Sequence, residues 1–364
     1  MLIRKLLYLG LPLLFFLSGC MKDDQLWEFE SPAFNLPYSG IFVINEGNFM
    51  YGNASLTYYD PETRQVIDDV FFQTNALPLG DVALSMTIRD SLGYVVVNNS
   101  GRIYIIDTGT FELKGKITGL TSPRYMHFIS ETKAYVSDLY ARSIAVVNPQ
   151  TREVTGSIPV DNSNGDFPQH ATEQMLQYDR FVYVNCWSFD RQVLVIDSEL
   201  DQVVDSIEVL KQPNSMVLDR HHALWVLCDG GAEGSPYGNE AAGLLKIGAG
   251  STEAQIIHRF SPGEIPRDLK INGTGDTLFY INRNVYQFAV NGFNDPKLLI
   301  ESPYEVSVWT GFYGLDVDPV SSEIYVADAI DFVQRGMVYR FTPEGVAVDT
   351  FRTGIAPGGF CFNF

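Results

Sequence analysis

Residues 135–158 read YVSDLYARSIAVVNPQTREVTGSI, and this stretch contains the pattern on which the fold depends. Short runs of Val, Ile and Tyr, which favour strands, alternate with turn-forming Asp, Asn, Pro and Gly residues. The run PRYMHF at residues 123–128 precedes it and is followed by a polar turn at residues 130–132. Residues 123–160 therefore predict four short strands joined by turns.

The same succession of segments recurs through most of the chain. Each repeat is centred on an aromatic residue, and the successive spacings are 41, 48, 42, 55 and 45 residues for Tyr94, Tyr135, Tyr183, Trp225, Tyr280 and Tyr325. Repeats of this length, each with four strands, are typical of the blades of a β-propeller. The pattern predicts six complete blades.

Two incomplete repeats lie at the ends of the pattern. Residues 41–71 supply IFVIN, SLTYYD and QVIDDVF, which match the second, third and fourth strands of a repeat, and residues 358–364, GGFCFNF, match a first strand. An open solenoid does not explain why the two fragments are complementary. One blade shared by both ends closes a ring and leaves no free edge. We therefore expect an all-β fold, a seven-bladed β-propeller closed by a blade shared between N- and C-terminal strands.

The first 38 residues have a different character. Arg4 and Lys5 precede an apolar run at residues 6–17, which ends in Leu-Ser-Gly-Cys20. This order is that of a bacterial lipoprotein signal peptide, which is cleaved before a cysteine that then carries lipid. We expect a signal peptide at residues 1–19, a lipidated tether at residues 20–38 that begins with Cys20, and the propeller at residues 39–364. A plain secretory signal with a chance cysteine is the alternative.

Composition excludes several classes of partner. The 364 residues include 44 acidic and 25 basic ones, for a formal net charge of −19. A chain this negative repels nucleic acid and anionic membrane surfaces, so we expect no nucleic acid partner and contact with membrane only through the lipid anchor. Cys186, Cys228 and Cys361 lack the spacing of a disulfide framework or a zinc site. We expect them to be small buried residues, and their pairing state stays open.

The predicted connections differ in length between the two faces of the propeller. Those between strands one and two, and between strands three and four, are short polar hairpins. The connections on the opposite face are long, and binding surfaces are commonly built from such loops. Eight aromatic residues lie in them: Phe49, Tyr51, Tyr140, Trp187, Phe189, Tyr237, Tyr304 and Trp309. Polar candidates on the same face are Asn45, Asn48, Asn98, Asn99, Arg124, Asp138, Arg142, His170, Asn185, Arg191, Asn214, Arg267, Asn282, Arg283 and Asp328.

Aromatic walls with amide and guanidinium donors suit a large, flat, partly polar ligand. The alternative is that these aromatic residues only pin their loops. No catalytic motif with a specific spacing occurs, so we expect a protein that is not an enzyme and has no catalytic cofactor or metal site. His170 is a lone candidate for a general base or a metal ligand, and Glu46 with Asp328 is a candidate acid–base pair.

The repeat at residues 135–158 resembles the blades of YncE-like propellers. The lipoprotein signal, the Lys22-Asp-Asp24 tether and the opening GIFVINEGN at residues 40–48 are similar to the surface lipoproteins of the BtuG family of Bacteroidetes. This resemblance implies a lipid-anchored protein of the outer membrane that faces the cell exterior. It also implies binding of cobalamin, a corrinoid, and its transfer to a BtuB-like TonB-dependent transporter. A propeller lyase or hydrolase, a glycan-binding subunit of another transporter, and a tether to the periplasmic face remain open alternatives.

Overall fold

A computed structural model describes residues 32–34, 36, 39–162, 168–292, 295–304 and 311–363. The chain divides into two compact units, Met1–Pro32 and Ala33–Phe364. The expected signal peptide, the lipidation site Cys20 and most of the tether lie outside the described residues, as does Trp309. Within the described residues, no helix combines the length and the apolar character that spanning a membrane requires.

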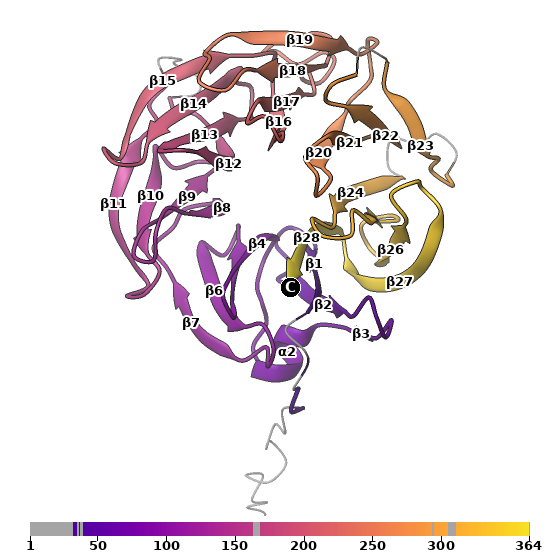
Figure 1. Ribbon diagram of the computed structural model, residues 1–364. Coiled ribbons are helices and arrows are strands. Elements are labelled where there is room, and N and C mark those ends of the chain that lie inside the picture. The colour runs from indigo at the N-terminus through magenta and orange to yellow at the C-terminus, as the bar shows by residue number, and fades with distance from the viewer. Residues whose placement is uncertain are drawn as a thin grey trace, which may run out of the picture. The chain divides into compact units, whose positions relative to one another are not determined.

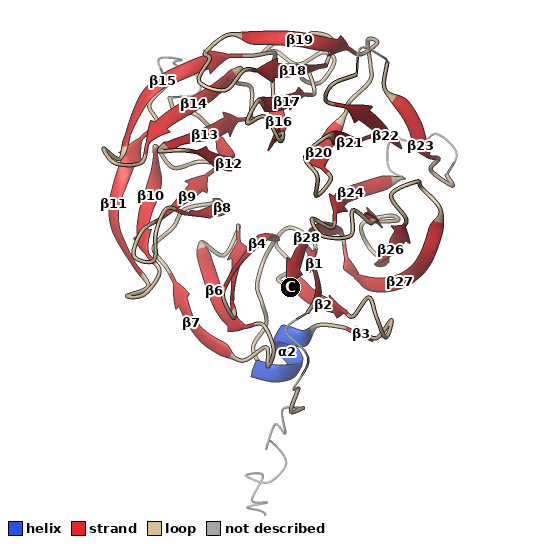
Figure 2. Cartoon of the chain, viewed as in Figure 1, coloured by secondary structure: helices blue, strands red, loops and turns tan. Residues whose placement is uncertain are grey.

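Residues Ala33–Phe364 form seven four-stranded antiparallel sheets arranged as the blades of a β-propeller, as the sequence predicts (Figures 1 and 2). The inner strand of each blade lies toward the centre of the ring and the fourth strand lies at its periphery. Six blades follow one another along the chain, and the strands of each are given from the inner to the outer strand. The first two blades are β4 (Ala83–Arg89), β5 (Leu92–Val97), β6 (Arg102–Asp107) and β7 (Leu113–Ile117), and then β8 (Pro123–Phe128), β9 (Ala134–Asp138), β10 (Ser143–Asn148) and β11 (Glu153–Pro159).

The third and fourth blades are β12 (Thr172–Tyr178), β13 (Phe181–Cys186), β14 (Gln192–Asp197) and β15 (Gln202–Glu208), and then β16 (Pro213–Leu218), β17 (Leu224–Cys228), β18 (Gly243–Ile247) and β19 (Ala254–Arg259). The fifth and sixth blades are β20 (Arg267–Ile271), β21 (Thr277–Asn282), β22 (Asn284–Ala289) and β23 (Lys297–Ile300), and then β24 (Phe312–Val317), β25 (Ile324–Asp328), β26 (Arg335–Phe341) and β27 (Ala347–Ile355).

The remaining blade combines both ends of the pattern. Its strand order is β28 (Pro357–Asn363), β1 (Gly40–Asn45), β2 (Ser55–Tyr59) and β3 (Val66–Ile67). β28 and β1 pair antiparallel, from Gly40 opposite Asn363 to Ile44 opposite Gly359. The last strand is shorter than the segment at residues 65–71 predicts. Asp69 has a left-handed backbone conformation that ends it, and the helix α2 (Val70–Asn75) follows.

The hydrophobic core lies between neighbouring blades. One cluster joins Tyr135 and Ile144 of one blade to Val184 and Leu194 of the next. Both faces of most blades are therefore covered, which explains why their strands read as nearly continuous apolar runs. The aromatic residues that mark the repeats are at most 6% exposed, so their regular spacing reflects a repeated packing position: Tyr94, Tyr135, Tyr183, Trp225, Tyr280 and Tyr325.

Candidate ligand-binding site

The long-loop face is defined by the connections from second to third strands and from fourth strands to the next blade. These include residues 46–54, 68–82 and 229–242. All aromatic side chains that are strongly exposed among the described residues belong to these connections: Phe49, Tyr51, Phe72, Tyr140, Phe189 and Tyr237. The hairpins of the opposite face instead expose single aliphatic residues such as Leu200 and Val320. The aromatic surface is therefore confined to one face.

Several predicted polar residues organise this face from within. The carboxylate of Asp138 accepts hydrogen bonds from the backbone amides of Ser122, Tyr140 and Ala141, and Asp328 accepts one from Ile330. Both aspartates are at most 4% exposed. They form turns at the ends of second strands, a common role of Asp. Their position in the repeat reflects loop geometry, and their predicted contact with a ligand stays a prediction.

Buried and half-buried amides join neighbouring blades. Asn98, Asn185 and Asn214 each donate a hydrogen bond from Nδ2 to the carbonyl oxygen of a proline in the next blade or just before it, at 3.1, 2.7 and 2.7 Å for Pro123, Pro213 and Pro266. Asn45 is fully buried and bonded to Thr57 and Thr353. The amides that the sequence suggests as ligand donors are thus largely used to hold the scaffold together.

The other predicted residues are partly or strongly exposed at the rim. The indole nitrogen Nε1 of Trp187 donates to Asp229 at 3.0 Å, and the rings of Phe189 and Tyr237 lie 4.5 Å apart. Three predicted amides form hydrogen bonds, namely Asn48 with Phe332, Asn99 with Asp81 and Asn282 with Glu264. Arg191 pairs with Glu208 and Glu240, and His170 pairs with Asp190. Arg142 and Arg283 are exposed. Their proposed contacts with a ligand stay a prediction.

A ring of equivalent residues lies where the inner strands begin. Every inner strand has a register shift at its second residue, and such β-bulges re-aim a side chain. We call these seven residues the channel ring: Leu84, Arg124, Glu173, Asn214, Asp268, Tyr313 and Gly358. Each follows a fourth-to-first connection, so the channel ring lies at the long-loop end of the inner strands.

Two charged members of the channel ring, Arg124 and Glu173, form an ion pair. Nε of Arg124 lies 2.8 Å from Oε2 of Glu173, and their side chains are 16% and 5% exposed. Oε1 of Glu173 is buried without a hydrogen-bond partner among the described residues. Burial raises the pKa of Glu173, although the adjacent guanidinium of Arg124 opposes that shift. Arg267 donates to the carbonyl oxygen of Phe312 and lies over the ring of Tyr313, 5.3 Å from its centre.

Glu46 completes this cluster from the end of β1. Its carboxylate accepts a 3.0 Å hydrogen bond from the hydroxyl group of Tyr313. Gly358 makes room for it, because a Cβ atom there would lie 2.1 Å from Oε1 of Glu46. Burial raises the pKa of Glu46 to about 7 and that of Asp268 to about 6. The charges of Arg124 and Asp268 act on Glu46, so three separate blades contribute to one electrostatic cluster.

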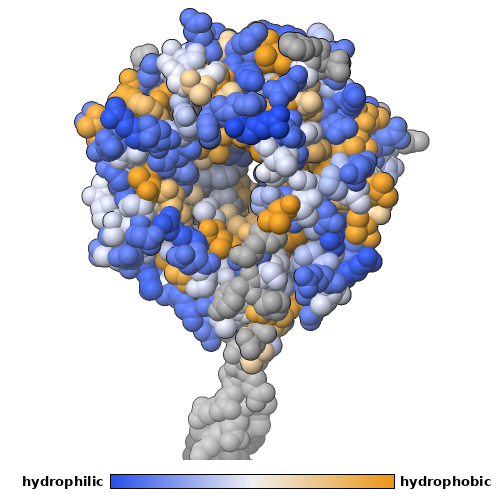
Figure 3. All heavy atoms as spheres, viewed as in Figure 1, coloured by the Kyte–Doolittle hydropathy of each residue, from blue (hydrophilic) through white to orange (hydrophobic). Residues whose placement is uncertain are grey.

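Below the channel ring, the inner strands line an open cavity of about 470 Å³. Its lining includes His127, Gln174, Leu176 and Lys270 from three inner strands. The space-filling view shows that the ring of blades is hollowed at its centre (Figure 3). Nζ of Lys270 lies 2.8 Å from Oδ2 of Asp316, so the lower wall of the channel also carries a paired charge.

Sequence reasoning missed most of the channel ring. Arg124 and Asn214 were among the predicted residues, but Glu173, Asp268 and Tyr313 were not. The pairing of Glu46 with Asp328 is not seen, because Glu46 binds Tyr313 and Asp328 supports a loop. The available signal was positional: each of these residues comes second in a predicted inner strand. The grouping of these side chains depends on the β-bulges of the inner strands, and the alternation of strand residues in the sequence does not reveal these bulges.

A family model described as a domain of unknown function, DUF5074, matches residues 39–342. The chain belongs to the DUF5074 family. A search of curated proteins found no match to the sequence. The description of the family names no activity.

Solved structures share the architecture of this DUF5074 chain. A quinonprotein alcohol dehydrogenase-like protein from Bacteroides thetaiotaomicron has a TM-score of 0.68 at 14% identity, covering 90% of this chain and 79% of that one. The periplasmic gluconolactonase PpgL of Pseudomonas aeruginosa has a TM-score of 0.63 at 11% identity, with 89% and 99% covered. A functionally unknown protein from Desulfotomaculum acetoxidans has a TM-score of 0.63 at 12% identity, with 89% and 99% covered. At these identities the likeness shows the fold alone.

Proposed function

We propose that the protein is a cell-surface lipoprotein that captures a corrinoid such as cobalamin on its long-loop face. The observation that carries this proposal is the confinement of the strongly exposed aromatic side chains to the connections of that face, above the charged channel ring. A corrinoid is a broad ring edged with amides. Aromatic side chains can pack against such a ring, while the carboxylates and guanidiniums of the cluster accept from and donate to amides.

Calorimetric titration of the purified propeller with cyanocobalamin tests the capture. We expect saturable binding to the wild type, and about tenfold weaker binding for the double variant Tyr51→Ala/Tyr140→Ala if these rings form part of the contact. Tyr51 and Tyr140 are 79% and 66% exposed, so folding should be unaffected. The matched control is Leu200→Ala/Val320→Ala, which removes side chains 60% and 74% exposed on the opposite face. Absence of binding to the wild type would reject the corrinoid.

Transfer to a TonB-dependent outer-membrane transporter is the second part of the proposal. It is supported by the resemblance to the BtuG family and by the predicted lipid anchor at Cys20. Copurification of the protein with a TonB-dependent transporter from detergent-solubilised outer membranes tests the partner, and we expect it.

Two further experiments test the anchor and the surface location. Labelling with a radioactive fatty acid should mark the wild type and not Cys20→Ala, and external protease should digest the anchored protein on intact cells. A labelled protein that is protected from protease would place it on the periplasmic face and reject the surface assignment.

A second candidate function, acid–base catalysis, is favoured by Glu46. A carboxyl group with a pKa of about 7 can exchange protons near neutral pH, and Arg124 and Arg267 are suited to hold the carboxylate that forms when a lactone is hydrolysed. The gluconolactonase PpgL shares the fold, and lactone hydrolysis is therefore the first reaction to assay. Turnover of gluconolactone that Glu46→Gln abolishes would favour the enzyme, whereas equal rates for both proteins would reject Glu46 as its catalyst.

A further inference from the structure

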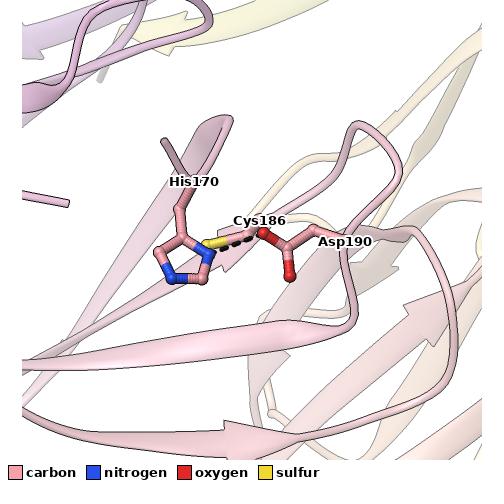
Figure 4. Close-up of side chains that lie close together, drawn as sticks. All are labelled: His170, Cys186 and Asp190. Atoms are coloured by element: carbon pink, nitrogen blue, oxygen red, sulfur yellow. Dashed lines mark hydrogen bonds and ion pairs between the residues drawn. The ribbon is translucent and has the colours of Figure 1, made fainter. Parts of the chain in front are cut away.

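His170, Cys186 and Asp190 form a compact group in one blade. One ligand atom from each lies within 4.8 Å of the other two, and Nδ1 of His170 is 2.6 Å from Oδ2 of Asp190. Figure 4 shows the three side chains converging, with the sulfur atom of Cys186 beside the imidazole. The sequence presents His170 as a lone candidate, and folding supplies the two partners that it lacked.

The backbone around this group is held by hydrogen bonds. The amide of His170 donates to Val160 at 2.9 Å, and the carbonyl oxygen of Asp190 accepts from Gln212 at 2.8 Å. Cys186 is the last residue of β13 and is fully buried. The side chains of His170 and Asp190 are 15% and 7% exposed. The three donor atoms thus lie on segments whose backbones are hydrogen-bonded, with His170 nearest to solvent.

The next blade offers an internal comparison. Cys228 ends β17 as Cys186 ends β13, and both are fully buried. His170 lies two residues before the inner strand of its blade, and Lys211 occupies the corresponding place. Asp190 lies four residues after Cys186, where the second blade has Ala232. The neighbouring blade therefore lacks the histidine and the carboxylate, so the repeat does not require them.

We propose that His170, Cys186 and Asp190 bind a divalent zinc ion, with a water molecule as the fourth ligand. A thiolate, an imidazole and a carboxylate together suit Zn²⁺ and not Mg²⁺ or Ca²⁺, which prefer oxygen ligands throughout. Zinc bonds of about 2.0–2.2 Å to nitrogen and oxygen place those atoms roughly 3.3 Å apart in a tetrahedron. Nδ1 and Oδ2, which lie 2.6 Å apart, need to separate by about 0.7 Å. Binding releases the thiol proton of Cys186 to solvent, and the proton between Nδ1 of His170 and Oδ2 of Asp190 is transferred through solvent to Nε2 of His170, so that both ligand atoms are free for the metal.

The direct test uses Co²⁺ as a spectroscopic substitute for zinc. Titration of the reduced propeller with Co²⁺ should produce a sulfur-to-cobalt charge-transfer band that saturates at one equivalent and is displaced by one equivalent of Zn²⁺. Cys186→Ser should lose the band, and the matched control Cys228→Ser should keep it. Native mass spectrometry of the wild type should show one bound zinc.

The variant His170→Gln provides a second test in case Cys186→Ser impairs folding of the core. His170 is the most exposed of the three residues, so its replacement should disturb folding least. We expect it to weaken Co²⁺ affinity at least tenfold while circular dichroism remains unchanged. Absence of the charge-transfer band in folded wild-type protein would overturn the site. Equal loss of the band in Cys186→Ser and Cys228→Ser would do so as well. Neither readout depends on corrinoid binding, so the metal site and the proposed function can fail separately.

Discussion

The side-chain oxygen Oδ1 of Asn45 accepts a 2.6 Å hydrogen bond from the hydroxyl group of Thr353, although 308 residues separate them in the chain. The same oxygen accepts from the amide of Gly354 at 3.1 Å, and Nδ2 donates to Oγ1 of Thr57. Asn45 and Thr353 are fully buried. This amide therefore joins the blade shared by both chain ends to the blade that precedes it.

Replacement of Asn45 by alanine should destabilise the propeller by about 1–3 kcal/mol, because the buried partners of the amide lose their hydrogen bonds. Urea unfolding followed by tryptophan fluorescence measures the change. Asn291→Ala is the control, since Asn291 is exposed and its loss should change stability by less than about 0.5 kcal/mol. Equal midpoints for Asn45→Ala and the wild type would show that this junction contributes nothing to stability.

The shared blade predicts a strong effect of truncation. A chain that stops at Ala356 lacks β28, so the inner edge of β1 loses its partner and becomes available for pairing with other chains. We expect the truncated chain to aggregate in size-exclusion chromatography or to unfold at a lower temperature in calorimetry. A chain that stops at Asn363 retains β28 and is the control. A monomer of unchanged stability after removal of β28 would contradict a structural role for the pairing.

The ion pair of Arg124 and Glu173 should respond asymmetrically to mutation. Glu173→Ala leaves a largely buried guanidinium without its carboxylate, which should cost about 3 kcal/mol in chemical denaturation. The double variant Arg124→Met/Glu173→Leu should be more stable than Glu173→Ala, since no unpaired charge remains. Glu112→Ala removes an exposed pair with Lys114 and should change stability by less than about 1 kcal/mol. A Glu173→Ala variant as stable as Glu112→Ala would refute the argument.

Glu46 should make stability depend on pH. Its pKa rises from 4.5 to about 7 on folding, so between these values the folded state binds more protons than the unfolded state. Its contribution is most favourable below pH 4.5 and is lost as pH rises to about 7. Burial also raises the pKa of Asp268, so Asp268 changes stability with pH in the same direction. The variant Glu46→Gln removes only the contribution of Glu46. The difference between the unfolding temperatures of Glu46→Gln and the wild type should change in favour of the variant from pH 4.5 to pH 7. The same pH dependence in both proteins would contradict this role of Glu46.

Most of the architecture could be predicted from the sequence because each blade repeats a local pattern. Strand residues, turn residues and a buried aromatic anchor recur at similar spacing, and the complementary fragments at the ends indicate a shared blade. The error at residues 65–71 arose where the pattern is weakest. Val70 and Phe71 are apolar enough for a strand, but the left-handed turn at Asp69 redirects them into a helix that packs on the core.

The sequence alone determined the repeat, the number of blades and the face on which long aromatic connections gather. Only the tertiary structure decided which polar side chains are available there, because this depends on contacts between blades. Asn45 is bonded to neighbouring strands through both of its side-chain polar atoms, and Nδ2 of Asn185 is bonded to Pro213, whereas Glu46, Arg124 and Asp268 interact electrostatically from blades far apart in sequence. His170 likewise acquires Cys186 and Asp190 only through folding. Strand propensity is local, whereas closing a ring brings together residues that no local pattern connects.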